Sequence, residues 1–483
     1  GNITVNQNKK RMNIIIIMTD QQKASSLPMY GNPTVRMPNL SRFCKRSITF
    51  NNAFTSCPLC VPARVSMFTG QYPSVHRSLD NNLLMEPGKE HMLKILKQNG
   101  YITGLAGKNH CFKPEDLVYF DFIEQSGHWG PETEDPCYLE PIEHLRSCAE
   151  LKGCWGHTKN PFAPEQLGTH WTTDRAIDFV TENRNMPFFL WFSIPDPHVP
   201  FQTPEPYASM YPPETVDMPE FREHEMENKP AAQQIDSKVM CADKVTEQTI
   251  REIRSIYYGM NTYIDDELGR FFDLLDSFGL YENTLVVYVS DHGEYLGEHK
   301  MIRKSKSAYD CLTHIPFIFY SPAVRPFRSD EFVSLEDIMP TVLNAADISV
   351  PQEVQGRDLS PLLCSGRMNS SRPFSYGEYG GRNEPVNKTA QITACETPLS
   401  YDFSPGLKLG GFGKMRYIRT ESWKLVCYIN DTFELYNIRN DPYELENLFT
   451  QDGYEQIKLK LMSMLTEHMM RINNPDISST RVS

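Results

Sequence analysis

The chain has 483 residues, of which 40% are hydrophobic and 23% charged, and its formal net charge is −13. This composition is typical of a globular protein and excludes a fibrous or disordered one, and the acidic balance argues against nucleic acid as a partner. The longest apolar runs have the length of a strand, so we expect no membrane span. The twelve cysteines are scattered and do not show the spacing of a disulfide scaffold.

Short apolar runs rich in β-branched and aromatic residues alternate with helical patterns along most of the chain. A long helix is predicted over Arg251–Phe278 because apolar residues recur there at helical spacing, whereas Pro204–Lys244 and Gly366–Gly413 look like long loops. The alternation predicts an α/β fold in which a large, mainly parallel sheet lies between helices. The predicted strands are Ile14–Thr19, Ile102–Ala106, Phe188–Ile194, Thr284–Ser290 and Pro316–Tyr320.

The end of the chain has a different pattern. Short antiparallel strands are predicted at Met415–Thr420, Trp423–Tyr428 and Thr432–Asn437, and a helix from about Tyr454 to Arg471 follows them. We therefore expect two domains, a larger one over residues 1–370 and a smaller α+β domain, with a short antiparallel sheet, over residues 371–483.

Polar side chains follow four of the predicted strands at the point where each strand ends. Ligands of open α/β sheets bind outside these carboxyl ends, so we expect the side chains to meet at one edge. Each of them could be an ordinary cap or turn residue, but together they offer oxygen and nitrogen ligands for a divalent cation beside a lysine. This combination predicts metal-assisted chemistry on a sulfate or phosphate ester. The residues are Asp20, Gln21, Lys108, His110, His198, Asp291 and His292.

Residues 56–70, SCPLCVPARVSMFTG, contain two cysteines three positions apart. Pro62 and Gly70 predict a helix through about Phe68, which places Cys60 at its N-terminus, where anions are stabilised, and Arg64 one turn further on. A nucleophile that attacks an anionic ester is well placed there. A redox pair of Cys57 and Cys60 is an alternative, but it leaves the polar strand ends unexplained. A zinc site would need a second Cys or His pair at matching spacing, and the chain has none.

These segments resemble the formylglycine-dependent type I sulfatases of the alkaline phosphatase-like superfamily, and among them the bacterial glycan and glycosaminoglycan sulfatases. The run from Cys60 through Pro62 and Arg64 to Thr69-Gly70 is similar to the family signature, which Cys57 does not match because no proline follows it two positions later. The resemblance includes the strand ends and the C-terminal strands and so covers nearly the whole chain. It implies that residues 1–370 are the catalytic domain.

The resemblance also implies a role for each matching residue. A formylglycine-generating (sulfatase-maturating) enzyme would oxidise Cys60, and the hydrated formylglycine would be the nucleophile. One Ca²⁺ would be held by Asp20, Gln21, Asp291, His292 and the modified Cys60, with Gln21 and His292 departing from the commoner Asp and Asn. Arg64 would orient the nucleophile, Lys108 and Lys304 would bind sulfate oxygens, His198 would protonate the leaving alcohol, and His110 would take the proton that regenerates the aldehyde.

The implied substrate is a sulfated saccharide of the glycosaminoglycan kind, with a sulfated uronic acid suggested by the stretch around His314. Further candidates for binding it are Arg77, Arg303, His314 and Arg382. The insert Phe112–Gln166, rich in Cys, His and Trp and including His128, could line a sugar subsite, form disulfides or simply pack. Family habit implies export, to the periplasm of a bacterium or to the lysosome or exterior of a eukaryotic cell.

Two alternatives stay open beside the sulfatase interpretation. A phosphonate or phosphate monoester hydrolase would share the fold, the formylglycine and the metal pairs, although Lys108 and His110 favour the sulfatase. A catalytically inactive binding protein would lack a ligand or the nucleophile, and none is missing from the sequence.

Overall fold

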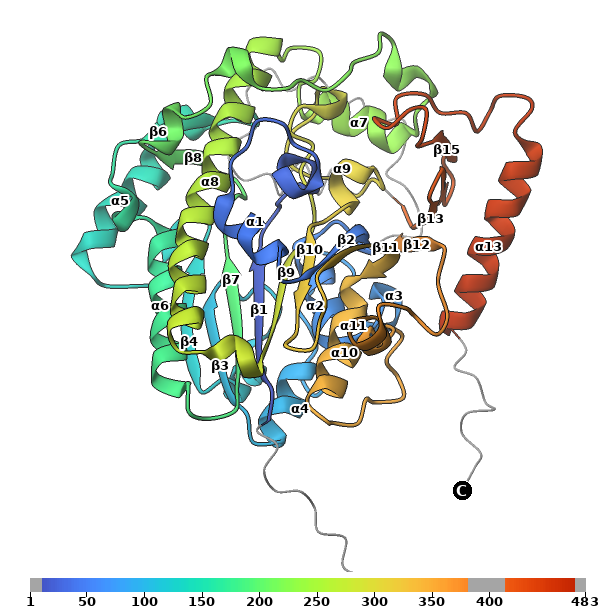
Figure 1. The fold of residues 1–483 in the computed structure, drawn as a ribbon. Coiled ribbons are helices and arrows are strands. Elements are labelled where there is room, and N and C mark those ends of the chain that lie inside the picture. The colour runs from blue at the N-terminus through green and yellow to red at the C-terminus, as the bar shows by residue number, and fades with distance from the viewer. Residues whose placement is uncertain (1–10, 381–412, 474–483) are drawn as a thin grey trace, which may run out of the picture.

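The computed structural model describes residues 11–380 and 413–473. A nine-stranded mixed sheet forms the centre of the molecule, and helices cover both of its faces (Figure 1). The predicted α/β fold with a large, mainly parallel sheet is confirmed. The strands lie in the order β11 (Phe327–Ser334), β2 (Ile48–Phe54), β10 (Phe317–Tyr320), β9 (Thr284–Ser290), β1 (Asn13–Thr19), β7 (Phe188–Ile194), β3 (Ile102–Gly107), β4 (Phe122–Gly127) and β5 (Gly130–Pro131).

Four of the predicted strands are direct neighbours at the centre of the sheet. β9, β1, β7 and β3 pair in parallel, so their carboxyl ends lie side by side. The fifth predicted strand, β10, is also present but runs antiparallel to β9 and β2. The sequence did not predict β2, β4 or β11, because mixed polar residues such as Asn51 and Asn52 interrupt their apolar pattern.

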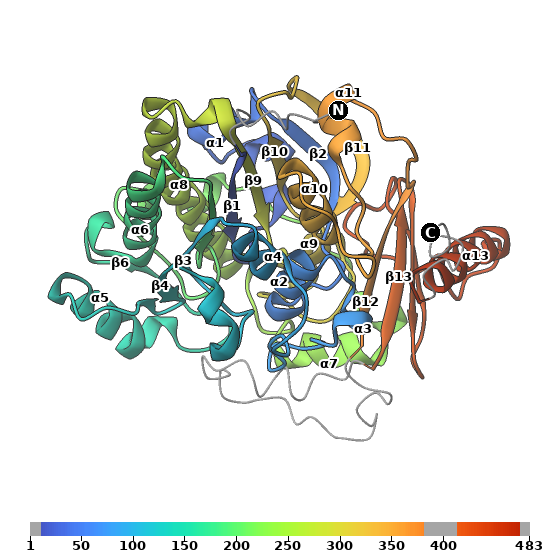
Figure 2. The same ribbon diagram turned by 90° about the horizontal axis from the view of Figure 1, so that it is seen from below.

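The continuous apolar run of β1 is explained by burial on both faces of the sheet. Ile15 and Ile17 pack in one hydrophobic cluster, and Ile14 and Ile16 pack in the other. The first cluster contains residues of α1 (Pro38–Cys44), α6 (Gly168–Asn183) and α8 (Glu247–Ser277), and the second those of α2 (Cys60–Thr69), α4 (Met92–Gln98) and α10 (Ile338–Ala345). Figure 2 shows these two groups of helices on opposite sides of the sheet.

Two local features decide where the important helices begin and end. The predicted long helix is confirmed as α8, but it starts one turn earlier than Arg251, because the Thr246 side chain accepts a hydrogen bond from the Thr249 amide and caps it. Helix α2 begins at Cys60 and ends at Gly70, whose φ of 64° lies in the left-handed region that glycine adopts without strain.

The C-terminal part contains a four-stranded antiparallel sheet with α13 (Glu455–Asn473) packed against it, as predicted (Figure 1). Its strands are β12 (Phe374–Tyr379), β13 (Met415–Thr420), β14 (Trp423–Tyr428) and β15 (Glu434–Asn437). The prediction of a loop over Gly366–Gly413 is wrong for β12, a short strand whose partner β13 lies far along the chain. The domain boundary at residues 370 and 371 stays a prediction.

The prediction of a loop over Pro204–Lys244 is also wrong in part. Helix α7 (Ala231–Val239) lies within it, and the Asp431 carboxylate accepts hydrogen bonds from the first two amides of this helix. The group that caps this helix comes from a distant segment, and the local sequence does not show it.

Short elements complete the fold. They are α3 (Pro73–His76), α5 (Pro136–Ser147), α9 (Asp310–Thr313), α11 (Ser360–Ser365) and the two-stranded sheet of β6 (His157–Asn160) and β8 (Phe201–Pro204). Among residues 11–380 and 413–473, no helix combines the length and the apolar character that a membrane crossing requires.

Candidate active site

The carboxyl ends of the four central strands bring their polar residues together. Asp20 and Gln21 follow β1, Asp291 and His292 follow β9, Lys108 follows β3, and His198 lies beyond β7. A backbone hydrogen bond of 3.3 Å from the Asp20 amide to the Asp196 carbonyl joins the ends of β1 and β7. The strand ends therefore form one shared site, as the sequence predicted.

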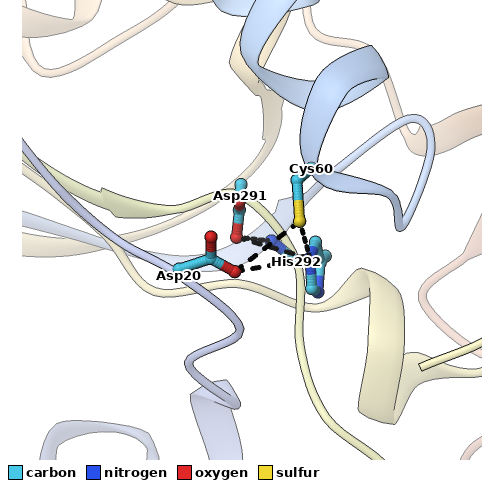
Figure 3. Close-up of side chains that lie close together, drawn as sticks. All are labelled: Asp20, Cys60, Asp291 and His292. Carbon is cyan, nitrogen blue, oxygen red and sulfur yellow. Dashed lines mark hydrogen bonds and ion pairs between the residues drawn. The ribbon is translucent and has the colours of Figure 1, made fainter. Parts of the chain in front are cut away.

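Cys60 enters this site from the first residue of α2. Its Sγ lies 3.2 Å from His292 Nε2 and 3.7 Å from Asp20 Oδ1 (Figure 3). Ligand atoms of Asp20, Cys60, Asp291 and His292 all lie within 4.8 Å of one another, and all four residues are buried. Four of the five residues expected to surround one cation thus converge on one point.

The donor set of this cluster fits a divalent cation. His292 Nδ1 lies 2.9 Å from the Gly293 carbonyl, and a neutral ring that donates there would direct the lone pair of Nε2 at the cluster. Two carboxylates and an amide oxygen would supply the hard ligands that Ca²⁺ takes. Asp20, Gln21, Asp291 and His292, with the side chain at position 60, would hold the ion.

Arg64 is buried beneath the cluster and binds both carboxylates. Its Nε donates to Asp291 Oδ2 at 3.1 Å and its Nη2 to Asp20 Oδ2 at 3.2 Å. Its Nη1 donates to Ser193 Oγ at 2.8 Å and to the Lys108 carbonyl at 3.1 Å. Through these contacts Arg64 holds the two carboxylates in place. Its role in orienting the nucleophile stays a prediction.

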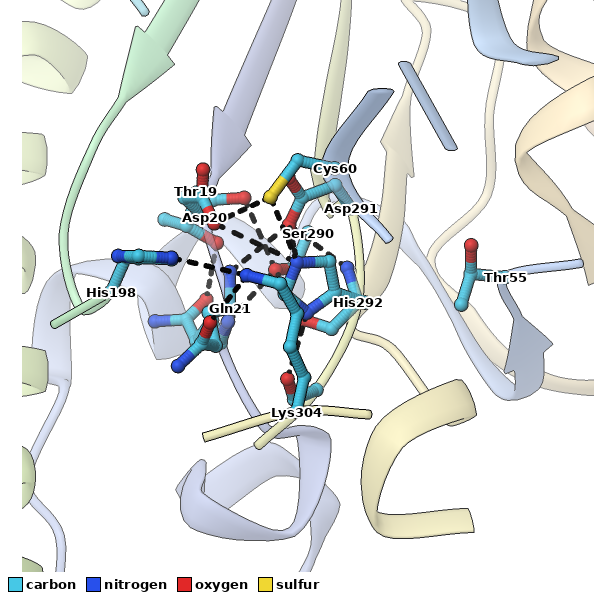
Figure 4. Close-up of polar contacts among 12 residues, drawn as sticks. Thr19, Asp20, Gln21, Thr55, Cys60, His198, Ser290, Asp291, His292 and Lys304 are labelled. Atoms are coloured by element: carbon cyan, nitrogen blue, oxygen red, sulfur yellow. Dashed lines mark hydrogen bonds and ion pairs between the residues drawn. The ribbon is translucent and has the colours of Figure 1, made fainter. Parts of the chain in front are cut away.

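Two lysines and two histidines form the other side of the site. Lys304 Nζ lies 2.9 Å from Gln21 Oε1 and 3.1 Å from His198 Nε2 (Figure 4). Lys108 Nζ forms an ion pair with Asp20 and lies 2.9 Å from His128 Nε2. The sequence named His128 only as part of the insert that could line a sugar subsite, and not among the catalytic or metal residues. His128 follows β4, which was not predicted, so no strand-end argument pointed to it.

The charges in the site act strongly on one another. Burial raises the pKa of the Cys60 thiol and so does Asp20, but Lys108, Lys304 and His292 outweigh them and lower it well below the ordinary value. Burial also raises the pKa of Asp20, yet the positive charges of Lys108 and Arg64 help to bring it well below its usual range. Burial and the charge of Asp20 raise the pKa of Asp291. Lys108, Lys304 and Arg64 therefore lie among the two carboxylates and the Cys60 sulfur, and their positive charges can also act on an anionic ligand.

Burial lowers the pKa of both site histidines. Neighbouring His128 and Lys304 lower that of His198 further, and Lys108 lowers that of His128. Both rings are thus neutral and can accept hydrogen bonds from the lysine ammonium groups at Nε2. In His198 the other nitrogen, Nδ1, donates to the Val199 carbonyl at 2.7 Å.

The redox alternative is not supported by the geometry. Cys57 packs in a separate apolar cluster with Tyr379 and Tyr417, and burial raises the pKa of its thiol well above the ordinary value. Cys57 and Cys60 are both free thiols.

The remaining predicted site residues are not part of the buried cluster. His110 has a φ of 40°, and its buried Nδ1 has no hydrogen-bond partner within the described part of the chain, so no contact links it to Cys60 there. Arg77 is exposed at the end of α3. Arg303 is buried and donates to the Gly153 carbonyl in the insert. Arg382 lies outside the described residues.

His314 does not face the cluster. Its Nε2 bonds the Asn51 carbonyl at 2.8 Å and its ring stacks on Phe54. It lines a separate cavity of about 340 Å³ with Lys23, Glu298 and Tyr443. The stretch around His314 therefore gives no support to a uronic acid at the site.

Comparison with known proteins places these features in a family. A protein-family model described as Sulfatase matches residues 12–348, and one described as N-sulphoglucosamine sulphohydrolase, C-terminal, matches residues 410–471. The chain is 28% identical over 479 residues to "Uncharacterized sulfatase YidJ" of Escherichia coli, covering 96% of this chain and 88% of that protein. It is 24% identical over 539 residues to the N-acetylglucosamine-6-O-sulfatase of Bacteroides thetaiotaomicron, covering 98% of this chain and 89% of that protein.

A solved structure of similar shape is the phosphonate monoester hydrolase from Silicibacter pomeroyi. It superposes with a TM-score of 0.80 at 21% identity and covers 95% of this chain and 96% of that one. At this identity the likeness shows the fold alone, and it is the fold expected from the sequence.

Proposed function

Because the chain belongs to the sulfatase family of sulfuric ester hydrolases, we propose that it removes sulfate from a sulfated saccharide, using formylglycine at position 60 and one Ca²⁺. The observation that carries this proposal is the convergence of Cys60 with Asp20, Asp291 and His292 in a buried cluster flanked by Lys108 and Lys304. A saccharide is proposed as the substrate because the family matches include an N-acetylglucosamine-6-O-sulfatase.

Formylglycine would supply a hydrated aldehyde hydroxyl as the nucleophile, and Ca²⁺ would supply a Lewis acid for the sulfate oxygens. The chain itself provides the remaining charge. The charges of Lys108 and Lys304 both act on Cys60, and they would balance the negative charge of the non-bridging sulfate oxygens, a role that gains strength in a buried site. Arg64 would hold Asp20 and Asp291 in place throughout.

The leaving alcohol of a sugar sulfate needs a proton, since an alkoxide is a poor leaving group. His198 Nε2 lies 3.1 Å from Lys304 Nζ, and a neutral ring whose Nδ1 donates to the Val199 carbonyl accepts there from the Lys304 ammonium group. We infer that Lys304 and His198 together supply this proton. The proton carried by Lys304 would pass to the alcohol oxygen either by way of His198 or directly from the ammonium group next to it. The proton of the second hydroxyl, whose removal would expel sulfate and regenerate the aldehyde, is assigned to His110, as the family resemblance implies.

Maturation of Cys60 is proposed to precede folding. The residue is only 1% exposed in the folded chain, so an enzyme that oxidises it could reach it only in the unfolded polypeptide.

The direct test is a mass measurement on the peptide that contains Cys60, in which the loss of sulfur is expected. Sulfate release from a panel of defined sulfated disaccharides should then identify the sugar and the position. Cys60→Ala should abolish release, and Cys57→Ala should leave it unchanged. Removing divalent cations with a chelator should stop turnover, and Ca²⁺ should restore it. Full activity in Cys60→Ala would overturn the mechanism.

Phosphonate monoesters are a second candidate substrate, because their tetrahedral, singly charged oxyanion would meet the same cations. Turnover of 4-nitrophenyl sulfate against that of a phenylphosphonate ester separates the two, and a larger kcat/KM for the phosphonate would reverse the assignment.

A further inference from the structure

Glu294 is a buried carboxylate that the reaction proposed above does not use. It lies two residues beyond His292 on the segment that follows β9 and is fully buried. Its Oε1 accepts hydrogen bonds from the backbone amides of Leu296, at 2.9 Å, and Arg303. Its Oε2 accepts from Gln21 Nε2. One carboxylate thus joins Gln21 to the segment that carries Lys304.

The carboxamide of Gln21 is held at both ends. Its nitrogen donates to Glu294, and its oxygen accepts from Lys304 Nζ at 2.9 Å. The backbone of Gln21 is held as well, because its amide donates to Asp291 Oδ1 at 3.0 Å and its carbonyl accepts from Tyr257 at 2.6 Å. Its φ of 63° is unusual for a residue other than glycine, and such a conformation persists only where the surroundings impose it.

We propose that Glu294 is a positioning residue that turns the Gln21 carboxamide so that its oxygen, and not its nitrogen, faces the cation site. The proposal rests on the metal role of Gln21 in the proposed function. An amide oxygen can bind a cation, whereas the amide nitrogen carries two hydrogens and would repel it. Asp or Glu at position 21 would present oxygen in either orientation, so only a carboxamide ligand needs such a partner.

An isosteric substitution separates this role from simple packing. Glu294 accepts three hydrogen bonds, one on Oε2 and two on Oε1. In Glu294→Gln one of these positions becomes an NH₂ group. If the nitrogen takes the place of Oε1, it meets two backbone amides. If it takes the place of Oε2, it meets the nitrogen of Gln21, whose carboxamide must then turn its own nitrogen towards Lys304.

A double variant restores the hydrogen bonds between positions 21 and 294 and has the same net charge as the parent protein. In the double variant Gln21→Glu with Glu294→Gln, the new amide nitrogen donates to a carboxylate at position 21, and the new amide oxygen accepts from the two backbone amides. The matched control is Glu298→Gln, which neutralises a partly buried glutamate of the same segment, paired with Lys23 and not with Gln21.

The experiment is calorimetric titration of Ca²⁺ into chelator-treated protein, together with the shift of Tm that Ca²⁺ produces. Glu294→Gln should weaken Ca²⁺ binding by about 10- to 100-fold, as loss of a partner behind a metal ligand commonly does. The double variant should recover most of that loss, and Glu298→Gln should bind as the parent protein does.

Each outcome decides a separate point. If the parent binds Ca²⁺ and Glu294→Gln binds it equally well, the inference is wrong and the proposed function stands. If the double variant binds no better than Glu294→Gln, the orientation argument is wrong. If the parent binds no Ca²⁺, both the inference and the metal assignment of the proposed function fail.

Discussion

The imidazole rings of His128 and His198 lie face to face, with their centroids 3.6 Å apart and an angle of 15° between their planes. Each ring accepts a hydrogen bond from a different lysine, His128 from Lys108 at 2.9 Å and His198 from Lys304 at 3.1 Å. Two lysine–imidazole pairs are therefore stacked on each other beside Cys60. His128 accepts a hydrogen bond from Lys108 and stacks on His198, which contacts Lys304. It should therefore affect the position of Lys108 and that of the His198 ring.

Substitutions at His128 should separate the effect of its hydrogen bond with Lys108 from the effect of its stacking on His198. His128→Phe keeps an aromatic face against His198 but removes the acceptor for Lys108, so we expect KM for a sulfate ester to rise. His128→Gln keeps an acceptor but removes the stacking ring, so we expect kcat to fall for substrates with poor leaving groups. Steady-state kinetics with a sugar sulfate and with 4-nitrophenyl sulfate measures both. Identical changes in the two variants would show that His128 only fills space.

Removal of His198 should depend on the leaving group. General acids commonly contribute about 10²- to 10⁴-fold, so His198→Ala should lower kcat for a sugar sulfate by an amount in that range. The loss should be much smaller for 4-nitrophenyl sulfate, because 4-nitrophenolate leaves without a proton. Equal losses for both substrates would assign His198 to sulfate binding instead.

The buried His91 should make the protein less stable in acid. Burial lowers the pKa of His91 to about 3. The folded state thus binds fewer protons than the unfolded state between the ordinary value near 6.5 and 3. The contribution of His91 to the free energy of unfolding is present in full above pH 6.5. It is lost as the pH falls from there towards 3, by up to about 1.4 kcal/mol per pH unit.

His91→Asn should reduce this dependence, while its side chain can still cap α4, as His91 does for the Lys94 amide. The measurement is the free energy of unfolding in urea between pH 7 and 4. The exposed His224→Asn is the control and should leave the slope unchanged, and a parent-like slope in His91→Asn would contradict the expectation.

Asp310 should anchor the C-terminal sheet to the large domain. It forms ion pairs with Arg419 of β13, at 2.8 Å, and with Lys424 of β14, at 2.6 Å. Burial raises the pKa of Asp310, but these two cations outweigh it and hold the pKa well below the usual range. Asp310→Asn leaves Arg419 without its ion-pair partner and leaves Lys424 with Glu444 alone, and should cost about 3 to 5 kcal/mol of unfolding free energy.

The control for this substitution is Asp273→Asn, which breaks an exposed pair with Arg42. Exposed ion pairs are worth at most about 1 kcal/mol, so this change should be nearly silent in thermal or urea denaturation. A loss at Asp310 no larger than that at Asp273 would show that the ion pairs do not hold the two parts together.

The central strands and the side chains that follow them could be predicted from the amino-acid sequence alone. β1, β3, β7 and β9 are buried on both faces, so each reads as a continuous apolar run with a clear end. Parallel strands deliver their ends to one edge, which is why Asp20, Lys108 and Asp291 could be placed together. Cys60 could be placed at the start of a helix because Pro62 and Gly70 mark the limits of α2.

The side chains that complete the site could not be predicted from the sequence and became visible in the folded structure. His128 and Glu294 contribute through contacts with residues 20 or more positions away, Lys108 and Gln21 respectively, and no local pattern marks such pairs. The same reason applies to α7 and β12, whose cap and pairing partner come from distant segments. Conversely, His314 belongs to a motif in the sequence, yet its backbone directs it to Asn51 and away from the cluster. Local periodicity is a property of neighbouring residues, whereas the direction and partner of a side chain depend on how the whole chain packs.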